Sequence, residues 1–510
     1  MHINRRRHSL RFVPRLMVGG MLLFGLVGNV STAPVVHAAI ISVNTTDDEL
    51  NNDGDCSLRE AIKAANTDSV VSGCSAGGAS DTIVVPEGTY TLSIPGRQED
   101  AGVTGDLDIG ADMTIDGAGS AATVIQAGFD ATNGIDRVFD VLGATVTFKE
   151  ITIRHGRAAG GPVPAVDHVG GGISSRAANG SSHITILECV IRVNTAPDAN
   201  GGGVFIGKPL HGSIPSLTIH GSTISSNTSG RGGGGIQCAG CDLDISASTI
   251  AGNHAEVSGG IGLGGGGLSV SGHAASATID KSTITDNATA GDGGGIYNDD
   301  GTVTVTRSRI VGNTAGGSGD GVRNDDLLGN GTVSAEDNWW GCDGFPGDVG
   351  CDDTSGPLDS DPRLNLLLSP ASASIPQNSS TKLEAAIASS SGAAQADTAL
   401  NGLTVTFGAG GLAGVSVVSG SDTIAGGLAS DIFSCGSTSG SATAWVTLDN
   451  GTQDTTIPCV TPPTPTPTAT ATTTPTATPT LAPTHAPTPT ATARVLDLYL
   501  PLLLRPKAGP

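Results

Sequence analysis

LTIHGSTISSNTSGRGGGGI, residues 217–236, recurs with small changes along the chain and decides the fold. Each copy has an apolar-x-apolar strand, a Ser two residues before an Ile, and an Asn three residues after that Ile. A Gly-rich segment follows most copies. Other copies are LDISASTIAGNHA (243–255), ATIDKSTITDNATAGDGGGI (277–296) and VTVTRSRIVGNTAGG (303–317). Self-similarity of this kind indicates an array of stacked units.

The spacing of the repeated Asn residues selects among the repeat architectures. The residues are Asn194, Asn227, Asn253, Asn287 and Asn313, with separations of 33, 26, 34 and 26 residues. A propeller blade needs about 40 residues, a helical repeat needs long stretches of 3.6-residue period, and a leucine-rich repeat needs its Leu pattern. None of these fits, so the sequence predicts a parallel β-helix with one coil per period. Strands are expected near Met113, Val146, Ile184, Leu217, Leu243, Ala277, Val303 and Val333.

Alignment of the units places residues in columns. One column holds Ile151, Cys189, Ser222, Ser248, Ser282, Ser308 and Asn338. Because an Ile and a Cys share it, we predict that this column faces inward and that Cys189 is a buried free thiol rather than a nucleophile. The Asn column, which Gly156 joins in an earlier unit, is predicted to be inward or turn-lining, where amides bond from coil to coil.

An outward column is rich in threonine. It holds Thr114, Thr147, Thr185, Thr218, Thr278 and Thr304, interrupted by Asp244 and Ser334. A flat threonine array suits the binding of ice or of crystalline glycans, but Thr is also a good strand residue. The column therefore predicts an exposed strand face and leaves its role open.

Composition and the N-terminus limit the compartment and the partners. The 510 residues carry a formal net charge of −23, which argues against nucleic acid and anionic membrane surfaces as partners. Residues 1–39 join the basic RRRHSLRFVPR (5–15), the apolar LMVGGMLLFGLVG (16–28) and small residues near Ala38. This pattern predicts a signal peptide and a secreted protein with no transmembrane helix in the mature chain.

Secretion makes the nine cysteines candidates for disulfides. They fall into local pairs, and Cys189 is left over. The expected bridges are Cys56–Cys74, Cys238–Cys241, Cys342–Cys351 and Cys435–Cys459.

The stretch DCSLREAIKAANTD, residues 55–68, predicts a short helix in a chain otherwise typical of strands. Ser57 and Glu60 fit a capping box. The apolar face is Leu58, Ala61, Ile62 and Ala65. Because the end of a β-helix exposes unpaired strand edges, we predict that this helix caps the first coil. A loose surface helix is the alternative.

This stretch resembles the CSLREA-type N-terminal region that precedes right-handed parallel β-helix repeats in secreted bacterial proteins. The similarity continues through DTIVVPEGTYTLSI (81–94), GDLDIGADMTIDGAG (105–119) and IDRVFDVLGATVTFKEITIRHG (135–156), and ends with DNWWGCDGFPGDVGCDDTSGPLDSDPRL (337–364). The resemblance implies an extracellular or surface protein of pectin-lyase-like fold, and it implies no single reaction. In the last segment, Trp339 and Trp340 are expected to close the far end of the coils, although a Trp pair also suits sugar stacking.

The region after the repeats contains SPASASIPQNSSTKLEAAI (369–387), LNGLTVTFGAG (400–410) and GSATAWVTLDN (440–450), which alternate like short antiparallel strands. It resembles a bacterial immunoglobulin-like module. The predicted fold class is all-β, a right-handed parallel β-helix with an N-terminal capping helix, plus a small β-sandwich. The predicted parts are the signal peptide (1–39), the N-terminal cap (40–104), the β-helix (105–364), the immunoglobulin-like sandwich (365–460), a Pro/Thr-rich stalk (461–493) and an apolar-basic tail (494–510). The tail lacks a sortase pattern; we expect it to be a sorting signal or a strand docked on a folded domain.

One group of acidic residues is a candidate metal site. Asp299 and Asp325 are 26 residues apart, as are Asp300 and Asp326, so the two pairs are expected to stack on adjacent coils. With Arg323 nearby they would suit a weak Ca²⁺ or saccharide site. The alternative is that Asn-Asp-Asp makes the turn between strands. The NTD sequence at 66–68 and the CAGC sequence at 238–241 lack the companion motifs of a polygalacturonase or a metal site.

No catalytic residues are predicted, and no cofactor is expected apart from the candidate Ca²⁺. The sequence favours a secreted, surface-retained β-helix with a non-catalytic adhesion, glycan-binding or envelope-structural role. Its expected partner is an extracellular glycan or a cell-surface component. The alternative is an extracellular polysaccharide lyase or glycoside hydrolase, which would need acidic and basic residues converging on one groove.

Overall fold

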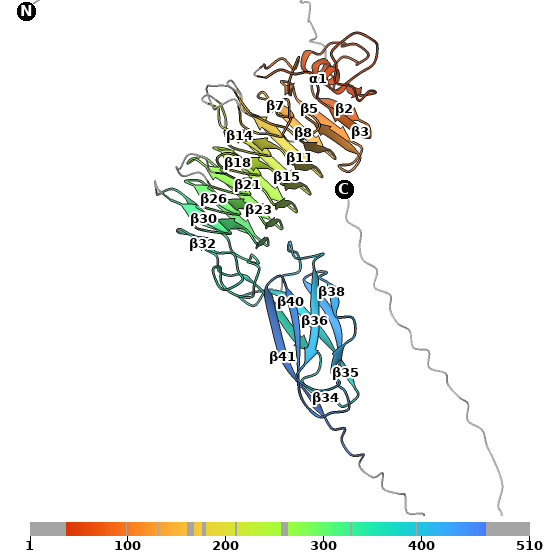
Figure 1. The fold of residues 1–510 in the computed structure, drawn as a ribbon, viewed down its shortest axis with the longest axis vertical. Helices are drawn as coiled ribbons and strands as arrows, with labels where there is room; N and C mark the ends of the chain where they lie inside the picture. The colour runs from red at the N-terminus through yellow and green to blue at the C-terminus, as the bar shows by residue number, and fades with distance from the viewer. Residues whose placement is uncertain are drawn as a thin grey trace, which may run out of the picture. The chain divides into compact units, whose positions relative to one another are not determined.

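Four short strands and the turns between them form one coil of the repeat, as a computed structural model shows. It describes residues 37–465 except 98, 131, 161–167, 176–179, 210–211, 257–263, 327–328 and 394. One coil contains β11 (His183–Leu187), β12 (Val190–Arg192), β13 (Thr195–Ala196) and β14 (Val204–Gly207). The next strand, β15 (Ser216–His220), then pairs in parallel with β11. Figure 1 shows such coils stacked in sequence from orange to green.

The stacked coils form four parallel sheets, numbered here in their order around the coil. Sheet 1 consists of β1 (Ile40–Ser42), β2 (Asp81–Val85), β5 (Met113–Gly117), β8 (Thr145–Lys149), β11, β15, β19 (Asp242–Ser246), β23 (Ser276–Asp280), β27 (Thr302–Thr306) and β31 (Thr332–Ser334). Sheet 2 consists of β3 (Gly88–Thr91), β6 (Thr123–Gln126), β9 (Thr152–Arg154), β12, β16 (Thr223–Ser225), β20 (Thr249–Ala251), β24 (Thr283–Thr285) and β28 (Arg309–Val311).

The other two sheets complete the coil. Sheet 3 consists of β13, β17 (Thr228–Ser229), β21 (His254–Ala255), β25 (Ala288–Thr289) and β29 (Thr314–Ala315). Sheet 4 consists of β4 (Leu107–Ile109), β7 (Phe139–Val141), β10 (Ile173–Ser175), β14, β18 (Ile236–Ala239), β22 (Leu268–Ser271), β26 (Ile296–Asp299), β30 (Val322–Asp325) and β32 (Thr354–Ser355). The predicted right-handed parallel β-helix is confirmed.

The core is made of columns of like residues, because parallel strands in register place equivalent side chains one above another. On sheet 2 the inward column is Ile125, Ile153, Ile191, Ile224, Ile250, Ile284 and Ile310, each fully buried. Burial of each such side chain stabilises the fold by about 1.5–3 kcal/mol relative to exposure.

Two polar columns run inside the corners of the coil, as predicted. The backbone N and the side-chain Nδ2 of Asn227 both donate to Oδ1 of Asn253, at 3.0 Å each. The same two hydrogen bonds link Asn253 to Asn287. Gly156 N donates to Asn194 Oδ1 at the start of this ladder. The serine column is bonded likewise, for example from Ser222 N to Ser248 Oγ at 3.2 Å.

A residue with positive φ precedes each position of these two columns and makes the corner. Before the serine column these residues are Glu150, Glu188, Gly221, Ala247, Lys281, Arg307 and Asp337. Before the asparagine column they are His155, Val193, Ser226, Gly252, Asp286 and Gly312. Most of these corner residues carry a side chain. A left-handed conformation costs such residues roughly 1–2 kcal/mol, which the bonded ladders offset. The Gly-rich segments make a different corner, between sheets 3 and 4, where Gly201, Gly233, Gly265, Gly293 and Gly319 have positive φ.

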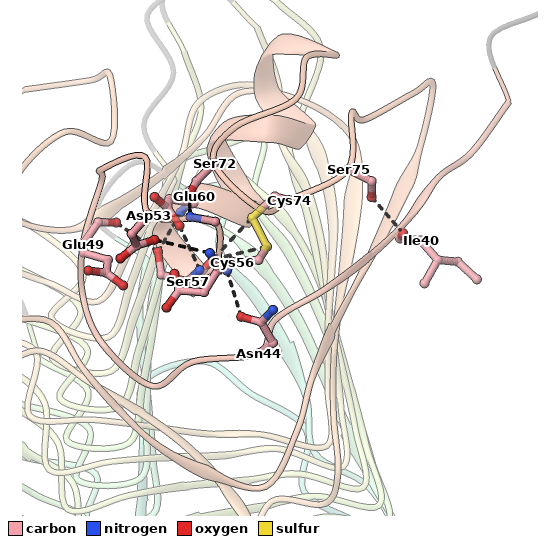
Figure 2. The surroundings of a disulfide bond; sticks show 12 residues. Ile40, Asn44, Glu49, Asp53, Cys56, Ser57, Glu60, Ser72, Cys74 and Ser75 are labelled. Carbon is pink, nitrogen blue, oxygen red and sulfur yellow. Dashed lines mark hydrogen bonds between the residues drawn. A yellow bond between two sulfur atoms is a disulfide. The ribbon is translucent and has the colours of Figure 1, made fainter.

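The N-terminal helix α1 (Leu58–Thr67) packs on the core of the first coils. Ser57 Oγ accepts from Glu60 N at 3.2 Å and Glu60 Oε2 accepts from Ser57 N at 3.0 Å, so the predicted capping box is present (Figure 2). A disulfide joins Cys56 to Cys74 beside it. The predicted apolar face is buried, which contradicts the loose-helix alternative.

Arg59 of α1 is buried, which the sequence did not suggest. Its Nε lies 2.7 Å from Asp48 Oδ1, and its Nη atoms donate to the carbonyl oxygens of Gly102, Gly105 and Asp106. The helix therefore holds the loop that leads into β4, in addition to covering the coil end.

The far end of the coils is closed by Trp339 and Trp340, which are 0% and 1% exposed. Trp340 belongs to the β-helix core and Trp339 to the core of the sandwich, where Trp339 Nε1 donates to Asp449 Oδ2 at 2.8 Å. The sugar-stacking alternative is wrong, because neither ring is accessible.

The remaining strands form a two-sheet β-sandwich. One sheet consists of β33 (Leu364–Pro370), β35 (Ser380–Ser389), β39 (Leu428–Ser434) and β37 (Ser416–Val417). The other consists of β34 (Ile375–Pro376), β41 (Gly451–Val460), β40 (Gly440–Leu448), β36 (Thr404–Gly410) and β38 (Ser421–Thr423). The side chains of Phe407, Phe433 and Val446 pack between them.

The disulfides are Cys56–Cys74, Cys238–Cys241, Cys342–Cys351 and Cys435–Cys459, the pairs expected from the sequence. Cys189 is free and buried. Across the described ranges, no helix has the length and apolar character needed to cross a bilayer. The predicted tail, the predicted signal peptide up to residue 36 and the stalk from residue 466 lie outside the described residues.

Candidate functional site

The predicted acidic pairs lie at the end of sheet 4. Asp299 and Asp325 are in register on β26 and β30, so their predicted stacking is confirmed. Asp325 Oδ2 accepts from Tyr297 Oη at 3.0 Å, and Asp326 Oδ1 accepts from Gly331 N at 2.9 Å. Asp300, with φ 63°, stands in the turn after β26. Of these four described carboxylates, no three place oxygen atoms within 4.8 Å of one another. This arrangement does not by itself support a metal site, which stays a prediction.

The predicted threonine column is present on the outer face of sheet 1. Strand pairing places Thr114, Thr147, Thr185, Thr218, Asp244, Thr278, Thr304 and Ser334 in one row, which Thr82 extends. The NTD sequence has a structural role instead, since Asn66 Nδ2 donates to Asp108 O at 2.7 Å and Asn66 Oδ1 accepts from Gly110 N at 2.9 Å.

Three arginines and one histidine lie together on the outer face of sheet 2 and the corner beyond it. We call Arg154, His155, Arg157 and Arg192 the basic patch. Arg154 and Arg192 are in register on β9 and β12, and Arg154 Nε donates to Gln126 Oε1 at 2.8 Å. Within the described ranges no carboxylate pairs with the three arginines. These charges are therefore available to a ligand in a protein that is otherwise acidic.

A hollow of about 320 Å³ adjoins the basic patch. It is lined by Thr132, Arg157, Val193, Asn194, Thr195, Pro197, Ser226 and Thr228. The loop that carries Thr132 also carries Phe129, whose side chain is 82% exposed. The loop is closed by Ile135 N, which donates to Ala127 O at 3.1 Å. Hydroxyl groups, a guanidinium group and an exposed ring are the groups that bind charged sugars.

The titratable groups around the hollow are poor acids for catalysis. Thr132 and Asn133 donate to the Asp130 carboxylate, which lowers the pKa of Asp130 to about 2. The pKa of His155 is lowered by burial and by the neighbouring Arg154. Asp130 is therefore ionised and His155 neutral near pH 7. A general acid for glycoside cleavage is thus missing from these two positions.

An acidic cluster that sequence analysis missed lies at the other end of sheet 4. It consists of Asp100, Asp106, Asp108, Asp136 and Asp140, with Arg137 among them. Arg137 Nε lies 2.5 Å from Asp106 Oδ2 and its Nη1 lies 3.5 Å from Asp140 Oδ2. Burial raises the pKa of Asp108 to about 8, and raises those of Asp106, Asp136 and Asp140 as well.

Glu49, Asp53 and Asp55 form a second acidic group. Figure 2 shows Glu49 and Asp53 beside Ser57 and Glu60 of the capping box. Residues 49–60 have the spacing of the calcium-loop pattern D-x-[DN]-x-[DN]-G-x₅-E, but Glu49 stands at the first position where the pattern has Asp. Glu60, however, accepts from the backbone amides of Asn51 and Ser57 at 3.0 Å each. The last carboxylate of the pattern is therefore engaged in capping α1.

Sequence signals for both missed sites exist. Asp108 and Asp140 are each flanked by apolar residues within a strand, which places both on the outer face of adjacent coils. Arg154 and Arg192 each stand two residues before a member of the asparagine column, Gly156 or Asn194. An alignment of these columns therefore predicts that Asp108 neighbours Asp140 and that Arg154 neighbours Arg192 on adjacent strands.

Comparisons with known proteins found similar structures but no related sequence family. No family model matches the chain. No curated protein matches it either. A crystal structure of pectate lyase Pel9A is similar with a TM-score of 0.37 and 15% identity, covering 64% of this chain and 79% of that chain. The Dettilon tailspike protein (gp208) gives 0.30 and 11%, covering 80% and 90%. Domains 4 and 5 of the S-layer protein SbsC give 0.14 and 15%, covering 20% and 55%. Similarities of this size say nothing about ligands or reactions.

Proposed function

We propose that this protein is a secreted, surface-retained β-helix that binds acidic glycans at the basic patch without cleaving them. One observation carries the proposal. In a chain of net charge −23, Arg154, Arg157 and Arg192 lie together beside a hydroxyl-lined hollow without carboxylate partners among the described residues. Unpaired arginines on an acidic protein are the feature that an anionic ligand would require.

The chemistry of the patch fits a uronate or sulfated saccharide. Guanidinium groups bind carboxylate and sulfate oxygens with two parallel N–H donors. Arg154 and Arg192 are on adjacent strands, about 4.8 Å apart along the stack, so an extended glycan meets more than one cation. Phe129 offers an apolar ring face, and Thr195 and Thr228 offer hydroxyl groups for the neutral part of the sugar.

The alternative, an extracellular polysaccharide lyase or glycoside hydrolase, needs clustered carboxylates, as Ca²⁺ ligands beside an Arg or Lys base in a lyase and as an acid and a base in a hydrolase. Of the described residues that we assign to the basic patch, none is a carboxylate. A hydrolase requires two carboxylates across the substrate, one of them protonated. At the hollow, Asp130 accepts hydrogen bonds from Thr132 and Asn133 of its own loop, which lower its pKa to about 2, so it cannot be the protonated acid. We therefore favour binding over catalysis at the basic patch.

Binding of oligosaccharides to matched variants tests the proposal. The probes are oligomers of galacturonate and of alginate, with a neutral oligosaccharide as reference. Arg154→Ala/Arg192→Ala removes two positive charges from the patch, and Lys149→Ala/Lys281→Ala removes two from elsewhere. We expect the arginine variant to bind at least about tenfold more weakly and the lysine variant to be unchanged. Release of unsaturated product, followed by ultraviolet absorbance, would support the lyase instead.

The same proposal covers the parts of the chain and its location. The four disulfides support an oxidising compartment, since they are rare in the cytosol. We take residues 40–104 as a CSLREA-type cap, 105–364 as a pectin-lyase-like β-helix and 365–460 as an immunoglobulin-like module on the stalk. The motifs of the cap and the two-sheet arrangement of the module support this division.

A further inference from the structure

We propose that one Ca²⁺ ion binds between Asp100, Asp108 and Asp140 and ties the loop before β4 to the first strands of sheet 4. This inference concerns the end of the β-helix that α1 covers. It does not depend on glycan binding at the basic patch.

The three carboxylates converge from two strands and one loop. Asp108 on β4 and Asp140 on β7 are direct neighbours in the parallel ladder. Asp100 comes from the loop that Arg59 holds through the carbonyl oxygens of Gly102 and Gly105. One oxygen from each carboxylate lies within 4.8 Å of one from each of the others. Because Ca²⁺ binds oxygen at about 2.3–2.6 Å, oxygens that share one ion lie up to about 5 Å apart.

Two of these carboxylates have an oxygen without a hydrogen-bond donor. Asp108 is 1% exposed and Asp140 is 8% exposed. Asp108 Oδ2 accepts from Gly102 N at 2.7 Å, and within the described part of the chain Asp108 Oδ1 and Asp140 Oδ1 have no donor in hydrogen-bond geometry. The Ser174 hydroxyl group lies opposite Asp140 on β10 and interacts with this carboxylate. A buried carboxylate oxygen without a donor is costly. A cation bound by both carboxylates would compensate their buried charge.

The charges around the cluster also favour a cation. Five carboxylates share one buried guanidinium group, that of Arg137, which is paired with Asp106 and lies near Asp136 and Asp140. Arg97 and His168 interact electrostatically with Asp136. Lys63 lines the same hollow as Asp100 and Asp108. Arg59 is already paired with Asp48. When all five carboxyl groups are ionised, as binding of a cation requires, the cluster holds more negative charge than these side chains neutralise.

The donor set and the access route select the ion. The three convergent ligands are carboxylates, with neither His nor Cys, which favours a hard cation over Zn²⁺. Asp100 is exposed, and a hollow of about 330 Å³ lined by Lys63, Asn66, Asp100 and Asp108 leads to the cluster. The hollow has room for the water ligands that complete the six to eight positions of Ca²⁺.

Calorimetry and melting of the folded chain test the site, with four forms of the protein compared after removal of metal by EDTA. Asp108→Asn/Asp140→Asn removes the ligands. Asp299→Asn/Asp325→Asn changes the equivalent in-register pair at the other end of sheet 4, and Asp53→Asn/Asp55→Asn changes the second acidic group. We expect wild type to bind one Ca²⁺ and to melt at a higher temperature with it. Asp108→Asn/Asp140→Asn should lose both effects, and the other two variants should keep them.

A milder variant keeps the test valid should Asp108→Asn/Asp140→Asn fail to fold. Asp100 is exposed, so Asp100→Ala should leave melting in EDTA unchanged and weaken Ca²⁺ binding by about tenfold. Absence of a Ca²⁺-dependent heat or melting shift in wild type would overturn the proposal. So would binding that survives Asp108→Asn/Asp140→Asn or Asp100→Ala, or that is lost only with the Asp53 or Asp299 variants.

Discussion

Asp108 and Asp140 lie opposite each other on the neighbouring parallel strands β4 and β7, both nearly fully buried. Burial removes the water that would solvate these two carboxylates, and like charges in adjacent positions of a ladder also repel. The result is a carboxyl group at Asp108 whose pKa is raised to about 8. This buried pair therefore lowers the free energy of unfolding of the first coils.

The first prediction follows from that cost. In EDTA near neutral pH, Asp108→Asn should raise the free energy of unfolding by about 1–2 kcal/mol, because the amide needs neither a proton nor a cation. Urea unfolding measures the change. Asp244→Asn, on the exposed threonine column, should change the free energy by less than about 0.5 kcal/mol. Equal effects of the two substitutions would show that the buried pair carries no such cost.

The second prediction concerns the asparagine ladder. Asn253→Ala leaves Asn227 N without its side-chain acceptor and Ile224 O without the Asn253 donor, and it removes one of the two acceptors of Asn227 Nδ2, which keeps Ile191 O. Each buried group without a partner costs about 1–3 kcal/mol, so we expect a loss of about 3 kcal/mol or more. Thr249→Ala, on the outer face of the same coil, is the control and should cost less than about 1 kcal/mol. A loss for Asn253→Ala no larger than for the control would contradict a structural role for the ladder.

The third prediction is a pH dependence at the end of the ladder. Asp352 accepts from Asn313 Nδ2 and from Gly312 N, yet burial raises its pKa to about 6. The unfolded value is lower, near 4, so the native state binds the proton more tightly. Its contribution is fully present below about pH 4 and is lost as the pH rises through 6.

Unfolding at several pH values checks the role of Asp352. Relative to Asp352→Asn, wild type should lose about 2–3 kcal/mol between pH 4 and pH 7. A constant difference between the two proteins over that range would contradict the raised pKa.

The fourth prediction concerns the free thiol. Cys189 is buried on the serine column and its Sγ donates to Leu187 O at 3.2 Å. Burial raises the pKa of this thiol to about 12, so little thiolate exists at pH 8. We expect native protein to react with a disulfide reagent roughly a thousandfold more slowly than denatured protein. Rapid labelling of the native chain would show that the column is open to solvent.

The sequence predicted the coils because stacking repeats the same demands at every turn. Asn194 and Asn227 occupy one environment, so the same residue type recurs and the period can be measured. The corner conformation was not predictable in the same way. Val193 takes a positive φ that its side chain disfavours, and only the bonded ladder next to it explains why.

The candidate sites were harder to predict because they join the repeat to segments outside it. Phe129 and Asp100 are in loops of the first coils that have no counterpart in later ones. Arg59 sits in a helix that has no repeat at all, and its bonds to the loop before β4 depend on tertiary packing. Column alignment finds neighbours along the stack and cannot place residues from such loops.

Titration calorimetry of a galacturonate or alginate oligomer against wild type and Arg154→Ala/Arg192→Ala tests the central claim most directly. The account predicts saturable binding by wild type that weakens at least about tenfold in the arginine variant and is retained by Lys149→Ala/Lys281→Ala. Binding that the arginine variant retains in full, or no binding of any acidic oligomer by wild type, would contradict it.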